Sequence, residues 1–348
     1  MNSKIIDHNE KTPFGVLICG HGSRNNLALK EFELLAQNIK SKLTGIPVEY
    51  GYLEFARPII TEALDRLRAQ SVKRVIAIPA MLFAAGHTKN DIPALLNQYS
   101  KSSGLSIKYG RELGINSLMI GAAGARVKEV LDKFSSLELS KTLLVVVGRG
   151  SSDPDANSNV TKITRMLVEG LGLGWGETVY SGVTFPLVEP GLRHLVRLGF
   201  KRIVVFPYFL FSGVLVDRIR KQTAKVAFDF PNIEFIEAGY LSSHPLVIET
   251  FKERIEEVFS GKNSMNCSLC KYRSNLLGFE EEVGTAQISH HYHVEGINTN
   301  CSICGRENLC VCKIETTQSN NDSEEVHDHI HHPIYPNSEH PLGPITLK

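Results

Sequence analysis

The chain lacks an excess of either charge: 38 lysines and arginines against 37 aspartates and glutamates leave a formal net charge of +1. A dedicated nucleic-acid binder usually has a basic surplus, so we expect no nucleic-acid partner. Runs of about 18 apolar residues, which a membrane-spanning helix needs, are also missing. The first residues do not show the charged-then-apolar order of a secretion signal. The sequence therefore predicts a cytoplasmic protein with no membrane partner.

Cysteine is nearly missing before residue 261, where only Cys19 occurs, inside an apolar run typical of a buried strand. The other cysteines are crowded into 267–312, and eight of the thirteen histidines lie beyond residue 289. In a reducing compartment, closely spaced cysteines indicate metal or cluster ligands rather than disulfides. We therefore expect residues 261–348 to be a partly disordered Cys/His-rich tail that binds a metal ion or a cluster.

What the sequence does contain is a long internal repeat. Two segments of the first copy return in the second, each as an apolar run followed by a turn: 14–24 returns as 143–152, and 74–83 returns as 202–211. Such a match predicts two copies of one domain, which we place at 1–138 and 139–260. The copies differ where the turns end. His21 and His87 occur only in the first copy, and the second has Arg149 and, near the place of His87, Val214 or Leu215.

Each copy alternates short, continuously apolar runs with longer amphipathic stretches. This pattern predicts an α/β fold in which helices cover both faces of a parallel sheet. Ligands bind such sheets at the carboxyl ends of the strands. His21 follows the first predicted strand, Glu54 ends the second, and His87 follows the third. We therefore expect these three side chains to converge at one sheet edge, where imidazoles could hold a transition metal or transfer protons.

Three segments of the first copy resemble the class II chelatases, the family of sirohydrochlorin chelatases. They are Gly20-His21-Gly-Ser-Arg24, Tyr52-Leu-Glu54-Phe-Ala-x-Pro58 and Pro79-x-Met-Leu-Phe-x-Ala-Gly-His87. The resemblance implies that His21 and His87 bind the metal and that Glu54 is the acidic catalytic helper. It also implies a single active site, with the second copy as the other wall of a cleft.

The implied reaction is the insertion of a divalent metal, cobalt preferred, into sirohydrochlorin during cobalamin synthesis. Sirohydrochlorin carries carboxylates around its rim, so cationic contacts are needed near the site. The candidate cations are Arg24, Arg57, Lys89 and Arg149. Two alternatives stay open: iron insertion for sirohaem, which the same histidines would serve, and a metal chaperone or sensor that acts through the tail. A downstream enzyme of tetrapyrrole synthesis is a further possible partner.

The tail resembles that of the long-form sirohydrochlorin cobaltochelatases. The resemblance lies in Met265-x-Cys267-x2-Cys270 and in His290-His291-Tyr-His293. It implies an iron–sulfur cluster on Cys267 and Cys270, while zinc stays an alternative that spacing does not exclude. The further candidate ligands in the tail are Cys301, Cys304, Cys310, Cys312, His290, His291 and His293. Because the proposed catalytic histidines lie elsewhere, we expect the tail to be dispensable for metal insertion.

Overall fold

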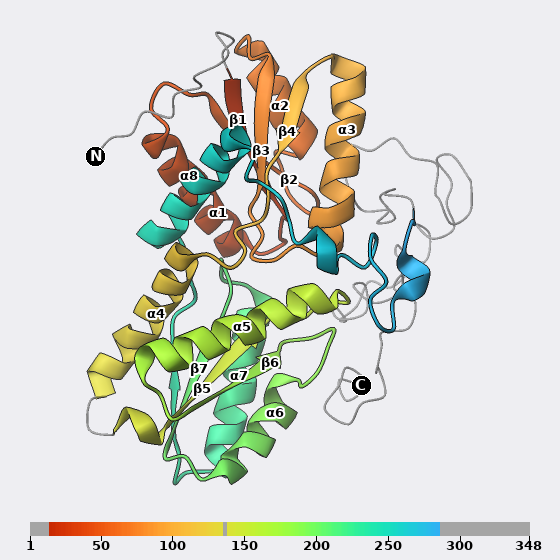
Figure 1. The fold of residues 1–348 in the computed structure, drawn as a ribbon. Helices are drawn as coiled ribbons and strands as arrows, with labels where there is room; N and C mark the ends of the chain where they lie inside the picture. The colour runs from red at the N-terminus through yellow and green to blue at the C-terminus, as the bar shows by residue number, and fades with distance from the viewer. Residues whose placement is uncertain (1–13, 135–137, 286–348) are drawn as a thin grey trace, which may run out of the picture.

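The computed structural model describes residues 14–134 and 138–285, which form two similar α/β halves (Figure 1). In the first half, a parallel four-stranded sheet has the order β2-β1-β3-β4. Its elements are β1 (Phe14–Gly20), α1 (Asn26–Lys42), β2 (Val48–Tyr52), α2 (Ile60–Ala69), β3 (Arg74–Pro79), a π-helical turn η1 (His87–Asp91), α3 (Ile92–Ser103), β4 (Ser106–Tyr109), α4 (Ser117–Leu131) and η2 (Asp132–Phe134).

The second half repeats this sheet as β6-β5-β7-β8, again fully parallel. Its elements are η3 (Leu139–Lys141), β5 (Thr142–Gly148), α5 (Pro154–Leu171), β6 (Trp175–Tyr180), α6 (Val188–Leu195), η4 (Val196–Leu198), β7 (Arg202–Pro207), α7 (Val214–Asp229), β8 (Glu234–Glu237) and α8 (Pro245–Ser260), followed by two short turns, η5 (Cys267–Leu269) and η6 (Glu280–Glu282). The predicted architecture of two tandem sheets is confirmed. None of the helices in the described part of the chain could cross a membrane.

The central strands are apolar throughout because helices cover both faces of each sheet. On β1, Leu17 and Cys19 face α2 and α3, whereas Val16 and Ile18 face α1 and α8. Every one of these four side chains is fully buried. Burial also raises the pKa of the Cys19 thiol, so Cys19 is an uncharged core residue, as its apolar run predicts.

The last helix of each repeat packs on the other repeat. Helix α8 lies against β3 and α1 of the first half, while α4 lies against α5 of the second half (Figure 1). Matching arginines fix both helices: Arg254 of α8 donates to the Leu113 carbonyl at 2.5 Å, and Arg126 of α4 donates to the Leu241 carbonyl at 3.2 Å. Each packed body therefore contains one helix from the other repeat.

The carboxyl ends of the two sheets meet at the junction of the halves. Phe83, which follows β3, stacks on Tyr208, which follows β7, with ring centroids 5.7 Å apart. Glu31 of α1 accepts hydrogen bonds from the Ser212 backbone and from the Tyr240 hydroxyl. Residues that follow the strands of one half thus contact those of the other half.

Candidate metal site at the sheet edge

His21 and Glu54 are brought together by backbone pairing that continues beyond β1 and β2. The amides of Leu53 and Glu54 donate to the carbonyls of Gly20 and His21 at 2.9 and 3.0 Å. The next residue, Gly22, has a φ of +100°, and a Cβ there would lie 1.7 Å from the Glu54 carbonyl oxygen. Only glycine permits so close an approach of the two backbones. The Gly-His-Gly sequence is therefore a steric requirement for placing His21 beside Glu54.

The ring nitrogens of His21 have distinct roles. Nδ1 lies 3.1 Å from the Gly22 carbonyl, which can only accept, so Nδ1 carries a proton and donates it. Nε2 lies 3.1 Å from Oε1 of Glu54, whose side chain is 1% exposed. In neutral His21, Nε2 and the carboxylate would face each other with a lone pair each. This arrangement is stabilised when a proton or a metal ion lies between the two atoms.

His87 lies at the start of the π-helical turn after β3 and is oriented by Asp91. Its Nδ1 lies 2.7 Å from Oδ2 of Asp91, a carboxylate with no solvent exposure. Asn90 donates to the other carboxylate oxygen at 3.3 Å. A carboxylate on one ring nitrogen fixes the tautomer and leaves the other nitrogen, Nε2, as an acceptor. π turns are rare in proteins overall, and those that occur are often found at functional sites.

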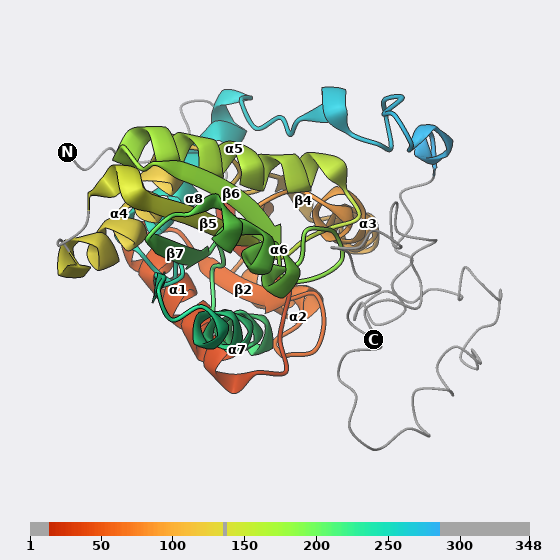
Figure 2. The same ribbon diagram turned by 90° about the horizontal axis from the view of Figure 1, so that it is seen from below.

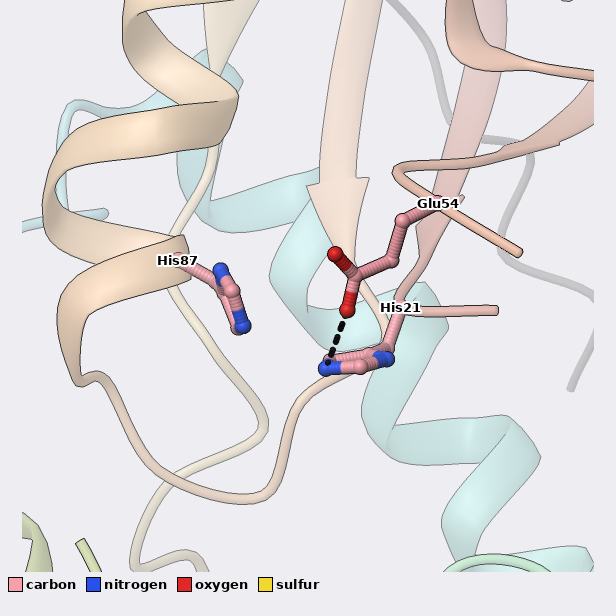
Figure 3. A group of neighbouring side chains, drawn as sticks. All are labelled: His21, Glu54 and His87. Atoms are coloured by element: carbon pink, nitrogen blue, oxygen red, sulfur yellow. Dashed lines mark ion pairs between the residues drawn. The ribbon is translucent and has the colours of Figure 1, made fainter. Parts of the chain in front are cut away.

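The three side chains converge on one point (Figure 3). The rings of His21 and His87 are nearly perpendicular, with centroids 4.8 Å apart. One ligand atom from each of His21, Glu54 and His87 lies within 4.8 Å of the other two, and no other set of three such residues is found among the residues that the structure describes. Two imidazoles and one carboxylate suit a divalent transition metal and leave coordination positions open for another ligand.

The predicted substrate-binding cations lie in different environments. Arg24 lies over the Phe55 ring, 5.1 Å from its centroid, and that ring is 6.2 Å from the ring of His21. Arg57 pairs with Glu62 at the start of α2 and is largely exposed. Arg149 is exposed and stands at the position of the second half that corresponds to His21. The structure thus places Arg24 beside the candidate metal site, with Phe55 between them.

Lys89 is not the exposed cation that we expected. Its side chain is 5% exposed, and its Nζ lies 2.6 Å from Asp153 and 3.5 Å from Asp155 at the start of α5. Burial lowers the pKa of Lys89, but the charges of Asp153, Asp155 and Cys270 outweigh burial, and the net effect raises it. Lys89 therefore joins the His87 turn to the second half, and the expectation that it binds substrate carboxylates is corrected.

The second half keeps the backbone of this site without its ligands. Gly150 repeats Gly22: its φ is +88°, and a Cβ there would lie 1.9 Å from the Gly182 carbonyl. Arg149 and Gly182 replace His21 and Glu54 in this arrangement. Helix α7 begins directly at Val214, with no π turn before it. The difference between the copies that the sequence predicts therefore extends from side chains to a local change of helix type.

Asp91 is a residue of the candidate site that the sequence analysis missed. It follows His87 by four residues, a spacing that brings side chains together on one helix face. That spacing was the available signal. In the tail, Cys267 is an exposed free thiol and Cys270 a buried one. The remaining predicted tail ligands, Cys301, Cys304, Cys310, Cys312, His290, His291 and His293, lie outside the described residues.

Comparisons with known proteins cover both repeats. The family model CbiX matches residues 15–130 and again 143–258. A sirohydrochlorin cobaltochelatase of Priestia megaterium is 37% identical over 75% of this chain and 85% of its own length. A sirohydrochlorin ferrochelatase of the same organism is 27% identical over 72% of this chain and 92% of its own. The crystal structure of the sirohydrochlorin chelatase SirB from Bacillus subtilis subspecies spizizenii in complex with cobalt is 25% identical, with a TM-score of 0.60 over 72% of this chain and 97% of that one.

Proposed function

The chain belongs to the CbiX family, and from this premise we propose that it is a sirohydrochlorin cobaltochelatase that inserts Co²⁺ into sirohydrochlorin during cobalamin synthesis. The observation that carries the proposal is the convergence of His21, Glu54 and His87 within 4.8 Å. The second half, with Arg149 and Gly182, lacks these ligands. The enzyme therefore has one active site, and the second half supports substrate binding.

Metal insertion exchanges two pyrrole N–H protons for one divalent cation and releases water from that cation. His21 and His87, each with Nδ1 engaged, offer Nε2 to the incoming ion. Glu54 balances the charge of the cation, and as the ion moves to the macrocycle the three side chains become bases for the two protons. Asp91 keeps His87 in the tautomer that binds metal and stabilises its imidazolium when it takes a proton.

Substrate carboxylates are bound by arginines of both halves in this proposal. Arg24 and Phe55 form a stacked pair next to His21, and Arg149 is the exposed cation at the corresponding turn of the second half. A guanidinium binds a carboxylate through two parallel hydrogen bonds, which suits a flat substrate with charges on its rim. Arg57, which pairs with Glu62, is the more remote candidate.

Anaerobic incubation of the purified chain with sirohydrochlorin and Co²⁺, Fe²⁺ or Ni²⁺ tests the function. The absorbance change of the macrocycle should be fastest with Co²⁺ and should slow about 10³-fold in the His21→Ala variant. A faster reaction with Fe²⁺ would favour the ferrochelatase activity that the second Priestia megaterium relative carries in its name. Binding of Co²⁺ with no acceleration for any metal would overturn the proposal and favour a chaperone or sensor.

For the tail we propose an iron–sulfur cluster with Cys267 and Cys270 among its ligands. The support is their spacing and their state as free thiols. Anaerobically purified protein should then be brown, and a Cys267→Ser/Cys270→Ser variant colourless. Colourless wild-type protein with stoichiometric zinc would contradict the cluster. A cytoplasmic location, in which such thiols stay reduced, belongs to the same proposal.

A further inference from the structure

The segment that follows α8 crosses the junction between the halves close to the His87 turn. Figure 2 shows this segment running past α5 toward the end of α3. Two of its asparagines attach it there. The Asn263 side chain donates to the Tyr109 carbonyl at 3.1 Å, and the Asn266 side chain donates to Oδ1 of Asp155 at 3.0 Å. Tyr109 belongs to the first half and Asp155 to the second, so the segment binds both.

Both contacts lead into the turn that holds His87. The hydroxyl of Tyr109 donates to the Thr88 carbonyl at 3.1 Å. Asp155 lies 3.5 Å from Nζ of Lys89. Thr88 and Lys89 are the residues immediately after His87, between it and Asp91. Two chains of polar contacts therefore run from the tail to the π turn, one through each half of the molecule.

The same segment is buried where it passes the junction. Cys270 and Lys271 are each 6% exposed. Lys271 lies 3.2 Å from Glu282, and the Gly284 amide donates to the Tyr272 carbonyl at 3.1 Å, so the chain folds back on itself over this point. The contact with the turn is therefore part of a packed layer rather than two isolated surface hydrogen bonds.

We propose that residues 263–270, which we call the tail clamp, position His87 by holding the π turn, so that the affinity of this enzyme for its metal depends on its tail. This inference rests on the proposed function. It replaces the expectation that the tail is dispensable for metal insertion. The physical reason is that a π turn, with its uncommon hydrogen-bond pattern, depends on its surroundings to persist. Asn263 and Asn266 are positioning residues, since neither touches the metal ligands.

The test uses the full chain with both asparagines replaced, Asn263→Ala/Asn266→Ala, and Asn275→Ala as the matched control. Asn275 lies in the same tail but is exposed. The KM for Co²⁺ should rise about tenfold in the double variant, the lower range for loss of a group that orients a metal ligand. The KM for sirohydrochlorin should stay unchanged, and kcat should fall less than the metal affinity. Free Co²⁺ is buffered, so that other metal-binding groups of the tail do not change its concentration.

Hydrogen exchange provides a readout that does not need turnover. Backbone amides of residues 85–92 should exchange faster in the double variant, while those of β1 and β5 keep their wild-type rates. Adding Asp155→Ala to Asn266→Ala should cause little further loss in metal affinity, because both variants break the same contact chain. Wild-type values for the Co²⁺ KM and for this exchange would overturn the clamp. A wild-type enzyme without chelatase activity would instead overturn the proposed function, and the exchange measurement would still decide on the clamp.

Discussion

The two halves of the molecule have the same glycine turn after their first strand, but only the first half carries a histidine and a glutamate beside it. Gly22 and Gly150 both have positive φ and both permit a carbonyl to approach within contact distance. Phe55 and Val183, the residues after Glu54 and Gly182, have φ values of 60° and 66°. Uncommon backbone conformations often mark functional sites. Here they recur in the half that lacks these side chains, so they belong to the fold, and the first half is distinguished by His21, Glu54 and His87.

The largest effect is expected when one of the two imidazoles of the first half is removed. His21→Ala and His87→Ala should each lower kcat for cobalt insertion about 10³-fold, because each ring is both a metal ligand and a base. Steady-state kinetics under anaerobic conditions measure the loss. His194→Ala, which removes an exposed imidazole from α6 of the second half, is the control and should keep wild-type rates. Equal losses of kcat in all three variants would contradict a single active site.

The next largest effect should come from the carboxylate behind His87. Asp91→Asn removes the charge that orients the ring and should weaken Co²⁺ binding about 10–100-fold, as loss of a carboxylate partner of a metal-binding histidine does. The KM for Co²⁺ reports the change. Asp217→Asn, on the exposed first turn of α7, makes the same replacement near the corresponding place of the second half and should have no effect. If Asp91→Asn also leaves the KM unchanged, the orienting role of Asp91 is wrong.

A smaller and different effect is expected where the second half has an arginine. Arg149→Ala should raise the KM for sirohydrochlorin about tenfold, the loss of roughly one charge-assisted hydrogen bond, and leave kcat nearly unchanged. Arg149→Lys should recover part of the affinity. Arg165→Ala, an exposed arginine on the outer surface of α5, serves as the control. A loss of kcat as large as that of His21→Ala would show that both halves take part in the chemistry.

The smallest predicted effect concerns the helix caps. Asn116 caps α4 and His244 caps α8, each accepting a hydrogen bond from the amide two residues on. Burial, together with Arg126, lowers the pKa of His244 below its usual range. The folded state therefore takes up this proton less readily than the unfolded state, and the cap stabilises the protein above the ordinary histidine pKa and is lost as pH falls through the lowered one.

Chemical denaturation at neutral and mildly acidic pH measures this cap. The wild type should lose up to about 1 kcal/mol more of its free energy of unfolding on acidification than a His244→Asn variant, which copies the cap of the first half and does not titrate. An identical pH dependence in the two proteins would exclude a contribution from His244.

The sequence was sufficient for the sheets and for the convergence of three side chains at one sheet edge because both follow from local patterns. Apolar runs predict strands, and the carboxyl ends of parallel strands share an edge, which brings His21, Glu54 and His87 together. Lys89 was misassigned because its partners, Asp153 and Asp155, come from the other half, and docking of two halves leaves no periodic signal. The π turn was missed for a related reason: His87 to Asp91 has an ordinary helical spacing, and only packing shows which type of helix forms.

The crossed packing of α4 and α8 also could not be predicted. Both helices are amphipathic, and each is the last helix of its own repeat in the sequence. The pattern of apolar residues therefore shows that each helix covers a sheet, but not which of the two sheets. The same holds for Asn263 and Asn266, polar residues in a polar segment whose contacts with Tyr109 and Asp155 depend on where the tail crosses the junction.

Because α4 packs on the second half and α8 on the first, the two repeats depend on each other for a covering helix. Two identical chains that exchanged their last helices would form a symmetric, domain-swapped homodimer. Every substitution would then be present in both of its sites. When both copies belong to a single polypeptide, the helices are still exchanged, but the two copies can differ in sequence. One site could keep its imidazoles while the other acquired Arg149. Cutting the chain between the repeats would leave each part without one covering helix, so neither part should fold without its complement.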